Sequence, residues 1–184
     1  MNDADLPKSR RALLLVDFIN PLDFPGAEDL APSALIAAKA AAKLAMAARE
    51  NSIPVIYAND NFGLWRSDFA AMVKRLEKGR GESAQIVRLM RPRQGDLTIL
   101  KPMHSAFFGS PLDIVLEKMG VRSIVLAGLA TDICIQLTAA DAFLRSLKVH
   151  VPPECTAAES EVKKRNALIY MRDILKCDIR PASI

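Results

Sequence analysis

The sequence predicts an α/β fold in which a parallel sheet is covered by helices on both faces. Short apolar runs alternate along the chain with longer segments of helical periodicity. The runs are continuous rather than alternating with polar residues, which is typical of strands buried on both faces. A β-α-β-α order requires parallel strands joined by right-handed crossovers. We therefore predict a three-layer α/β/α architecture.

Six apolar runs are the expected strands. Each is short, and helical or polar segments separate them. The last run is weaker than the other five. In chain order, the expected strands are Ala12–Val16, Ile53–Ala58, Leu97–Leu100, Ser123–Ala127, Lys148–Val151 and Cys177–Ile179.

Six helices are expected between and after these strands. Pro32 and Pro111 suit the first turn of a helix, Ser110 can cap the helix that begins beside it, and Gly120 fits a helix end. The expected helices are Pro32–Glu50, Ser67–Lys78, Ser83–Met90, Pro111–Met119, Thr131–Ser146 and Ala158–Leu175.

Length and composition predict a single domain over residues 1–184, because 184 residues with 51% hydrophobic content can bury a substantial core. No apolar stretch approaches the ~20 residues needed to span a bilayer, so we expect no membrane partner. The first residues lack the features of a secretory signal. Three cysteines form an odd set without metal-type spacing. We expect a cytoplasmic protein with reduced thiols.

The net charge of +4 is unevenly distributed. Residues 66–93 carry an excess of five positive charges, more than the whole chain. A basic patch can steer an anionic substrate or nucleic acid. The alternative is a solvated helical face, which we favour because neither interleaved aromatic residues nor a nucleic-acid motif accompanies the charges. We therefore predict no nucleic-acid partner.

Three reactive side chains stand at matching positions in this pattern. Asp17 and Lys101 each follow an apolar run directly, and Cys134 lies just beyond a third run, Ser123–Ala127. In parallel sheets, ligands gather beyond the carboxyl ends of the strands, where the strand order reverses. A carboxylate, an ammonium and a thiol at that edge make a nucleophile with its own base and electrostatic support.

Each of these residues also has a simpler interpretation. Cys134 is either an inert buried cysteine or a thiol in the first turn of a helix that Thr131 caps, where the helix N-terminus and Lys101 lower its pKa. Asp17 is either a loop cap or a functional carboxylate. Lys101, taken alone, is an ordinary surface lysine at a strand end. Their shared edge favours the nucleophile.

The most specific segment is Gly128–Ile135, with the sequence GLATDICI. The other segments that carry the same pattern are Leu14–Asp17 with Asn20, Asp23 and Phe24; Pro54–Tyr57; Gly95–Lys101; Ser105–Phe107; and Thr138, Ala139, Asp141 and Ala142. With these segments, nearly the whole chain resembles the isochorismatase-like cysteine hydrolases, which include nicotinamidases, N-carbamoylsarcosine amidohydrolases and isochorismatases.

The resemblance implies a six-stranded parallel sheet of Rossmann-like topology and a catalytic triad of Asp17, Lys101 and Cys134. Cys134 would attack a carbonyl or nitrile-like carbon and form a thioester that water cleaves. Asp17 would act as general acid and base, and Lys101 would stabilise the thiolate. The bond Leu129–Ala130 would be cis, and the N–H groups of Ala130 and Cys134 would form the oxyanion hole. Many relatives are dimers or tetramers, so we expect a homo-oligomer.

Two departures from the family narrow the chemistry. Nicotinamidases bind a metal through an Asp-x-His pair and a further His after the second strand, whereas Tyr57–Trp65 contains no histidine. The histidines of this chain are His104 and His150. Isochorismate-cleaving members lack the nucleophilic cysteine, so Cys134 indicates acyl chemistry.

We therefore expect a hydrolase that cleaves a C–N bond of a small amide or carbamoyl compound without a metal or organic cofactor. The alternatives are an isochorismatase-type ether or ester hydrolase and a catalytically idle α/β binding protein. His104 either assists binding or makes a structural hydrogen bond. The candidate pocket walls, whose alternative role is to anchor loops on the core, are Phe24, Phe62, Trp65 and Phe107.

Overall fold

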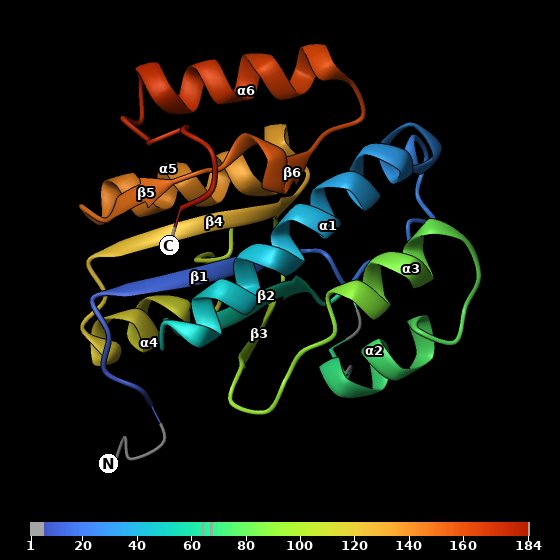
Figure 1. Cartoon of the computed structure of the whole chain (residues 1–184), viewed down its shortest axis with the longest axis horizontal. Coiled ribbons are helices and arrows are strands. Elements are labelled where there is room, and N and C mark those ends of the chain that lie inside the picture. Colours follow the sequence, from blue (N-terminus) through green and yellow to red (C-terminus); the bar gives the residue numbers. More distant parts are fainter. Residues whose placement is uncertain (1–5, 64, 67, 184) are drawn as a thin grey trace.

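A parallel sheet forms the middle layer of the computed structural model, which describes residues 6–63, 65–66 and 68–183 (Figure 1). Over these residues the sheet has six strands in the order β3-β2-β1-β4-β5, and β6 pairs with β4. Every pairing is parallel, which confirms the predicted fold class. The strands are β1 (Arg11–Val16), β2 (Val55–Asp60), β3 (Leu97–Lys101), β4 (Ser123–Leu129), β5 (Lys148–His150) and β6 (Thr156–Ala157).

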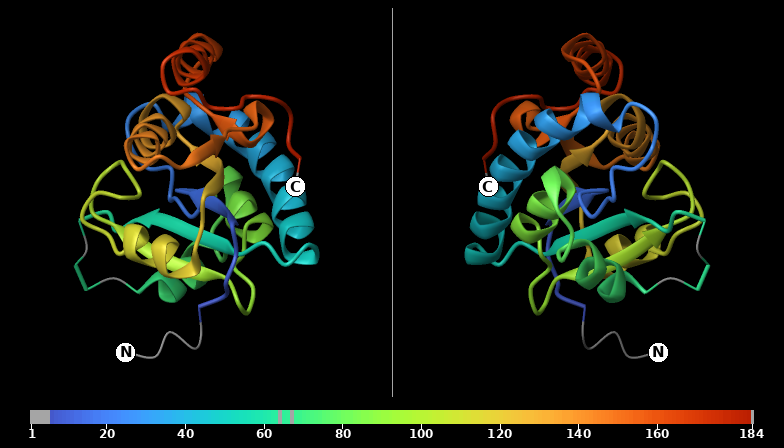
Figure 2. Two further views of the ribbon diagram at one scale, coloured as in Figure 1. Left: turned by 90° about the vertical axis from the view of Figure 1, so that its left-hand side faces the viewer. Right: turned by 90° about the vertical axis from the view of Figure 1, so that its right-hand side faces the viewer.

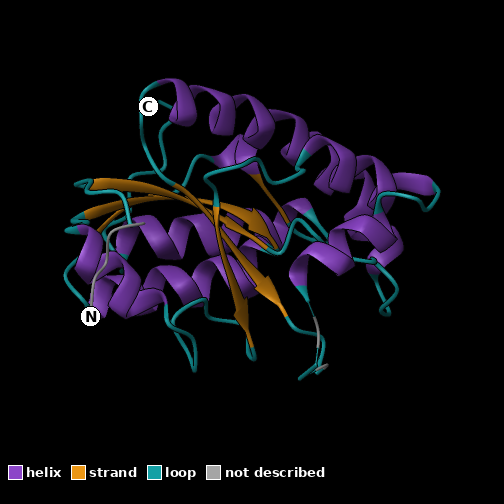
Figure 3. Ribbon diagram, turned by 90° about the horizontal axis from the view of Figure 1, so that it is seen from below, coloured by secondary structure: helices purple, strands orange, loops and turns teal. Residues whose placement is uncertain are grey.

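Helices cover both faces of the twisted sheet (Figure 3). Seen along the sheet in Figure 2, α1 and α5 lie on opposite sides of it. One face packs against α1 (Ala27–Glu50), α2 (Phe69–Leu76) and α3 (Gly81–Leu89). The other packs against α4 (Leu112–Met119), α5 (Gln136–Leu144) and α6 (Glu161–Asp173).

The alternation of side chains along β1 explains its continuous apolar run. Leu13 and Leu15 point into the core on the α1 side, and Leu14 and Val16 point into the core on the α4 side. All four side chains are essentially inaccessible to solvent. A strand with apolar packing on both faces has no position left for a polar residue.

Helix α1 is long and apolar enough to cross a membrane by length and composition alone. The apolar side of α1, rich in alanine and leucine, is buried against the sheet. Lys39, Lys43 and Arg49 interrupt the rest of its surface. These features are those of a core helix rather than of a membrane span.

Two strand predictions are corrected by the structure. Strand β2 extends past the apolar run to Asp60, because the Asn59 side chain exchanges two hydrogen bonds with the backbone of Ile19 and so replaces an apolar contact. The sixth strand is β6, not Cys177–Ile179, which forms a single bridge through Asp178 to His150. Strand β6 spans two residues and is too short to show an apolar pattern.

The helix predictions are correct in place but differ at their ends. Helix α1 begins at Ala27 after the left-handed residue Gly26, so Pro32 lies inside the helix rather than in its first turn. Ser110 Oγ accepts a hydrogen bond from Leu112 N–H (3.1 Å), but Pro111, expected in the first turn of α4, occupies the capping position instead of Ser110. Gly120 ends α4 as predicted. The expected first residue of the second helix, Ser67, lies outside the described residues.

Gly128 allows the close approach of β4 to β1 at the functional edge. Its φ is +145°, and a Cβ at this position would lie 2.0 Å from the carbonyl oxygen of Val16. We expect Gly128→Ala to destabilise the fold by about 2–4 kcal/mol, from the steric overlap and the strained φ together. Urea unfolding of the two proteins measures the difference. Unchanged stability would contradict the close contact between the backbones of these two strands.

Candidate active site

The three reactive residues lie where the strand order reverses. Asp17 directly follows β1, Lys101 ends β3, and Cys134 lies in a wide π-helical turn, Thr131–Ile135, after β4. Strands β2 and β3 lie on one side of β1, and β4 lies on the other. In open parallel sheets, this reversal leaves a crevice at the carboxyl ends of the strands, where ligands bind.

The side chains of these residues meet in one cluster. Lys101 Nζ lies 2.8 Å from Asp17 Oδ2 and 3.7 Å from Cys134 Sγ. It also lies 3.5 Å from Asp60 Oδ2 and donates a hydrogen bond to the carbonyl of Met103 (3.1 Å). Lys101 is fully buried, although lysine is one of the residues least often found there. Carboxylates on two sides offset the cost of burying its charge.

Opposing effects determine the protonation states of Lys101 and Asp17. Burial alone lowers the pKa of Lys101, but Asp17, Cys134 and Asp60 outweigh it and raise that pKa overall. Lys101 is therefore an ammonium at neutral pH. Burial raises the pKa of Asp17, and the attraction of Lys101 counters part of this rise. A carboxyl group whose pKa is raised is a better proton acceptor than an ordinary aspartate.

The expectation of a stabilised thiolate at Cys134 is wrong for the protein without substrate. Burial raises the pKa of this thiol, the negative charge of Asp17 raises it further, and Lys101 lowers it by less than these two effects together. Cys134 is thus a neutral thiol beside a proton acceptor. Ionisation has to accompany its attack on substrate rather than precede it.

This protonation state predicts how Cys134 reacts with iodoacetamide. Because the pKa of the thiol is raised, the thiolate fraction below that pKa falls tenfold for each unit of decreasing pH. We expect alkylation of Cys134 to be negligible at pH 6 and to accelerate steadily towards pH 9, always slower than in the urea-unfolded chain. Peptide mass spectrometry over a time course measures the rate. Fast alkylation that does not vary with pH would contradict the neutral thiol.

The backbone around Cys134 departs from regular structure. The bond Leu129–Ala130 is cis, at the position that the family resemblance indicates. The carbonyl of Ala130 accepts hydrogen bonds from the N–H groups of Ile133 (3.2 Å) and Ile135 (3.1 Å). This pattern widens the turn, and π-helical turns are frequent at functional sites.

Thr131 does not cap this turn, which corrects a second expectation. Ala130 occupies the capping position. Thr131 is completely buried, and its Oγ1 has no hydrogen-bond partner among the residues that the structure describes. The regular helix α5 begins only at Gln136, after the thiol rather than before it.

The four aromatic residues considered as pocket walls differ in their surroundings. Phe107 is buried in the same core cluster as Cys134, and the Arg145 guanidinium lies 4.6 Å from the centre of its ring, which favours an anchoring role. Phe24, Phe62 and Trp65 are exposed. The backbone N–H of Phe62 donates a hydrogen bond to Asp60 Oδ1 (2.6 Å), next to the Lys101 cluster. No contact places Phe24 or Trp65 against the cluster within the described part of the chain.

Sequence reasoning missed Asp60 as a member of the site. Its backbone N–H donates a hydrogen bond to Asp17 Oδ1 (2.7 Å), and its carboxylate faces Lys101. Asp60 lies opposite Lys101 in the pairing of β2 with β3. The available signal was its place two residues beyond an apolar run, like that of the other polar residues at this edge.

His104 contacts the reactive sulfur, a role that its spacing alone did not reveal. Its Nδ1 lies 3.8 Å from Cys134 Sγ. The side chain is exposed and lines a cavity of about 330 Å³ together with Met103, Phe108 and Leu137. One side of the sulfur therefore faces a buried ion pair, and another faces an imidazole at the protein surface.

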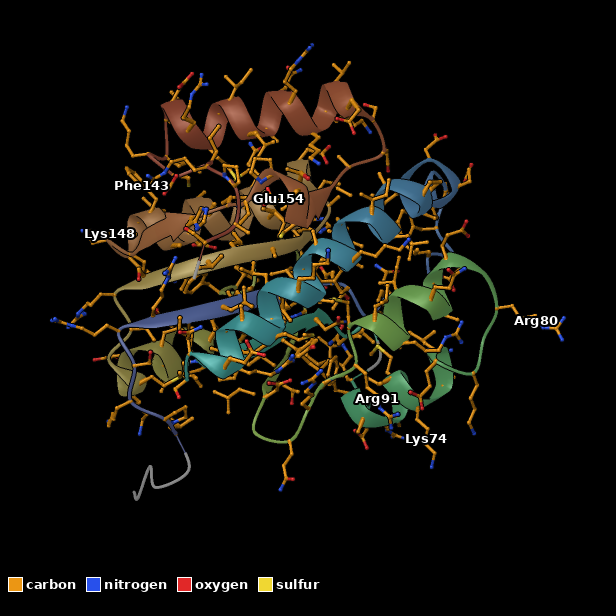
Figure 4. The ribbon with its side chains drawn as sticks, in the orientation of Figure 1. Lys74, Arg80, Arg91, Phe143, Lys148 and Glu154 are labelled. Carbon is orange, nitrogen blue, oxygen red and sulfur yellow. The ribbon has the colours of Figure 1, made fainter. Side chains whose placement is uncertain are left out.

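A larger cavity lies elsewhere and involves the basic segment 66–93. It measures about 840 Å³, lies between α2 and residues 91–100, and includes none of the three reactive residues. Figure 4 shows that Lys74 and Arg91 extend near α2, whereas Arg80 projects into solvent. The charged residues that line the cavity are Lys74, Arg91, Arg93, Asp68, Glu77 and Asp96. The two signs balance, so this cavity does not attract anions strongly.

Metal-binding potential is limited in the described ranges. Across residues 6–63, 65–66 and 68–183, there is no group of three or more His, Cys, Asp or Glu side chains placed to hold a metal ion. The residues around the sulfur supply two carboxylates, one ammonium and one imidazole.

Comparison with known proteins assigns the family. The isochorismatase domain model matches residues 11–177. YaaI of Bacillus subtilis, an uncharacterized isochorismatase family protein, is 34% identical over 95% of each chain. Maleamate amidohydrolase of Pseudomonas putida is 32% identical over 78% of this chain and 70% of its own. The structure of N-carbamoylsarcosine amidase from Thermoplasma acidophilum has a TM-score of 0.73 at 26% identity, and the match covers 96% of this chain and 99% of that one. This chain belongs to the isochorismatase family.

Proposed function

We propose that this protein is a cysteine hydrolase that cleaves a C–N bond of a small amide or carbamoyl compound through a thioester. The observation that carries the proposal is the contact of Cys134 Sγ with Lys101 Nζ, which is itself paired with Asp17. The names of two relatives, maleamate amidohydrolase and N-carbamoylsarcosine amidase, support amide hydrolysis.

The first half of the reaction is acylation of Cys134. The sulfur attacks the carbonyl carbon while the thiol proton passes to Asp17, whose raised pKa suits it to accept one. Lys101 keeps its positive charge beside the sulfur and stabilises the negative charge that develops there. The C–N bond then breaks, Asp17 returns the proton to the leaving nitrogen, and the acyl group remains on Cys134.

The oxyanion of the tetrahedral intermediate needs hydrogen-bond donors. We assign these to the backbone N–H groups of Ala130 and Cys134, as the family resemblance implies; Ala130 precedes the π-helical turn and Cys134 lies within it. One such donor contributes roughly 2.7–4 kcal/mol to transition-state stabilisation. The cis bond before Ala130 lies at this donor.

We infer that the reaction requires no metal ion or organic cofactor. Nucleophile, proton acceptor and oxyanion donors all come from the chain itself. The segment Tyr57–Trp65 also lacks the histidines that nicotinamidases use for a metal. Activity that persists after dialysis against EDTA is the expected result.

A substrate panel tests the proposal. Primary amides, ureido acids, lactams and maleamate are incubated with the protein, and ammonia release is measured. Intact-mass spectrometry after acid quenching looks for an acyl adduct, which peptide mapping should locate at Cys134. Hydrolysis of at least one compound with an adduct at this residue is expected. If no compound is hydrolysed and no activated ester or amide leaves an adduct, the protein is an idle α/β binding protein instead.

We also propose a cytoplasmic homo-oligomer. The cysteines Cys134, Cys155 and Cys177 are free and buried, which suits a reducing compartment. The alanine-rich side of α1 is used internally, but Ile36 and Met46 on the same helix are exposed and offer an apolar contact. A monomer mass in light scattering would refute the oligomer.

A further inference from the structure

We propose that His104 is the base that activates water in the second half of this reaction, the hydrolysis of the thioester. This inference rests on the proposed function and extends it. The 3.8 Å contact between His104 Nδ1 and Cys134 Sγ places the imidazole beside the atom that would carry the acyl group. A water that attacks the carbonyl carbon bonded to this sulfur lies within reach of the ring.

The two sides of the sulfur differ in access to solvent. Asp17 and Lys101 are 4% and 0% exposed, whereas His104 is exposed. Because the exposed ring of His104 contacts the sulfur, water from solvent reaches the thioester beside this ring.

Asp17 is less suited to this second step than to the first. Its Oδ1 accepts a hydrogen bond from the N–H of Asp60 (2.7 Å), and its Oδ2 is paired with Lys101 (2.8 Å). Both oxygens thus already have partners, and the side chain is buried. Asp60 is equally engaged, since it accepts from Phe62 N–H and faces Lys101.

The carboxylate of Asp141, which lines the same cavity as His104, is also occupied. Asp141 accepts a hydrogen bond from Ser105 Oγ (2.5 Å) and pairs with Arg145 (2.9 Å). By contrast, the hydrogen-bond contact of His104 among the described residues is the one with Cys134. His150 differs, because its Nε2 donates to the carbonyl of Arg180 (3.0 Å). A neutral imidazole without another partner can present its Nδ1 lone pair to water.

The proposed step conserves atoms and charge. Neutral His104 takes a proton through Nδ1 as the water oxygen bonds to the carbonyl carbon. The tetrahedral intermediate collapses, the C–S bond breaks, and the electron pair returns to the sulfur. The imidazolium then transfers its proton to the thiolate of Cys134. The products are a carboxylic acid, the neutral thiol and the neutral imidazole, ready for another cycle.

The test separates the two half-reactions with 4-nitrophenyl acetate as the probe. 4-Nitrophenolate leaves without needing a proton, so its initial burst reports the attack of Cys134, and the later steady rate reports hydrolysis of acetyl-Cys134. We expect His104→Gln to retain the burst within about twofold and to lower the steady rate by about 10²-fold, the lower end of the usual contribution of a general base. Acetyl-Cys134 should accumulate in intact-mass spectra.

Two controls accompany this variant. His150→Gln removes the other histidine of the chain and keeps an N–H donor for Arg180, so both phases should stay unchanged. In His104→Ala, added imidazole should restore the steady rate, because a diffusing base can fill the space of the lost ring. A merely structural role for His104 predicts no such rescue and no accumulation of acyl enzyme.

Other outcomes overturn the inference. An unchanged steady rate in His104→Gln would show that another group activates water. Loss of the burst together with the steady rate, in a variant with wild-type circular dichroism, would show that His104 ionises the thiol instead. The proposed function fails by a different result. It fails if the wild-type protein forms no acetyl adduct, or if the adduct still forms in Cys134→Ala.

Discussion

Cys134→Ala is expected to abolish amide hydrolysis, with a fall in kcat/KM of about 10⁴-fold or more. The reason is that the proposed thioester cannot form without the sulfur, and Asp17 and Lys101 then polarise no nucleophile. Ammonia release from the best compound of the substrate panel measures the effect. The variant should fold normally, since the change removes a single sulfur from a site at the edge of the core.

Cys177→Ala is the matched control for this substitution. Cys177 is also a buried free cysteine, but it follows α6, where its N–H donates to the carbonyl of Met171. Among the described residues, it makes no hydrogen bond with Asp17 or Lys101. The control should keep its activity per folded molecule. If Cys134→Ala retained turnover, the thioester mechanism would be wrong, and the result would favour an ether or ester hydrolase of the isochorismatase type, which needs no thiol.

Lys101→Met is expected to remove activity and also to destabilise the fold by about 3–5 kcal/mol. The substitution leaves the buried carboxylate of Asp17 without its cation, and an unpaired buried charge is much more costly than the intact pair. The same loss deprives Cys134 of its neighbouring positive charge. Urea unfolding measures the stability, and ammonia release measures the activity.

A double substitution separates these two consequences. In Lys101→Met with Asp17→Asn, the buried pair becomes neutral, so most of the lost stability should return while activity stays absent. Non-additivity of this kind is the signature of direct interaction between two side chains. A double variant as unstable as the sum of the two single variants would show that the buried pair does not couple as the 2.8 Å distance implies.

Much of this architecture could be predicted because a strand that is buried on both faces appears in the sequence as a continuous apolar run. The four apolar residues of β1 after Ala12 serve two cores, and the run stops where the strand leaves them at Asp17. The same logic located Lys101 at the end of β3. Parallel pairing then requires these ends to share an edge, so a local pattern implied a long-range proximity.

The parts that could not be predicted depend on contacts between distant segments. Strand β6 exists because Thr156 and Ala157 find partners in β4, and two residues carry no periodicity of their own. Asn59 and Asp60 look like loop residues but continue β2, since the backbone of Ile19 and the side chain of Lys101 satisfy them. Such partners, which are distant in sequence, cannot be inferred from the composition of the segment itself.

The charge state of the thiol shows the same limit most clearly. The position of Cys134 near a helix start and near a lysine predicts a lowered pKa for its thiol. Burial and the adjacent Asp17 raise this pKa instead. The charges of Asp17 and Lys101 beside the sulfur were readable from residue types, but that of Asp60 was not. Their net effect depends on distances of a few ångströms and on the exclusion of water, which scale the competing interactions differently.

The amino-acid sequence by itself therefore determined the layers of the fold, the edge that carries Asp17, Lys101 and Cys134, and the family to which their segments belong. Tertiary structure alone decided that Asp60 completes the ion-pair cluster, that the resting thiol is neutral, and that His104 stands on the solvent side of the sulfur. The physical reason is the distance along the chain over which each effect acts. Hydrophobic periodicity is a property of neighbouring residues. Hydrogen bonds and electrostatic effects on pKa depend on which groups distant in sequence come into contact and on how completely water is excluded from them.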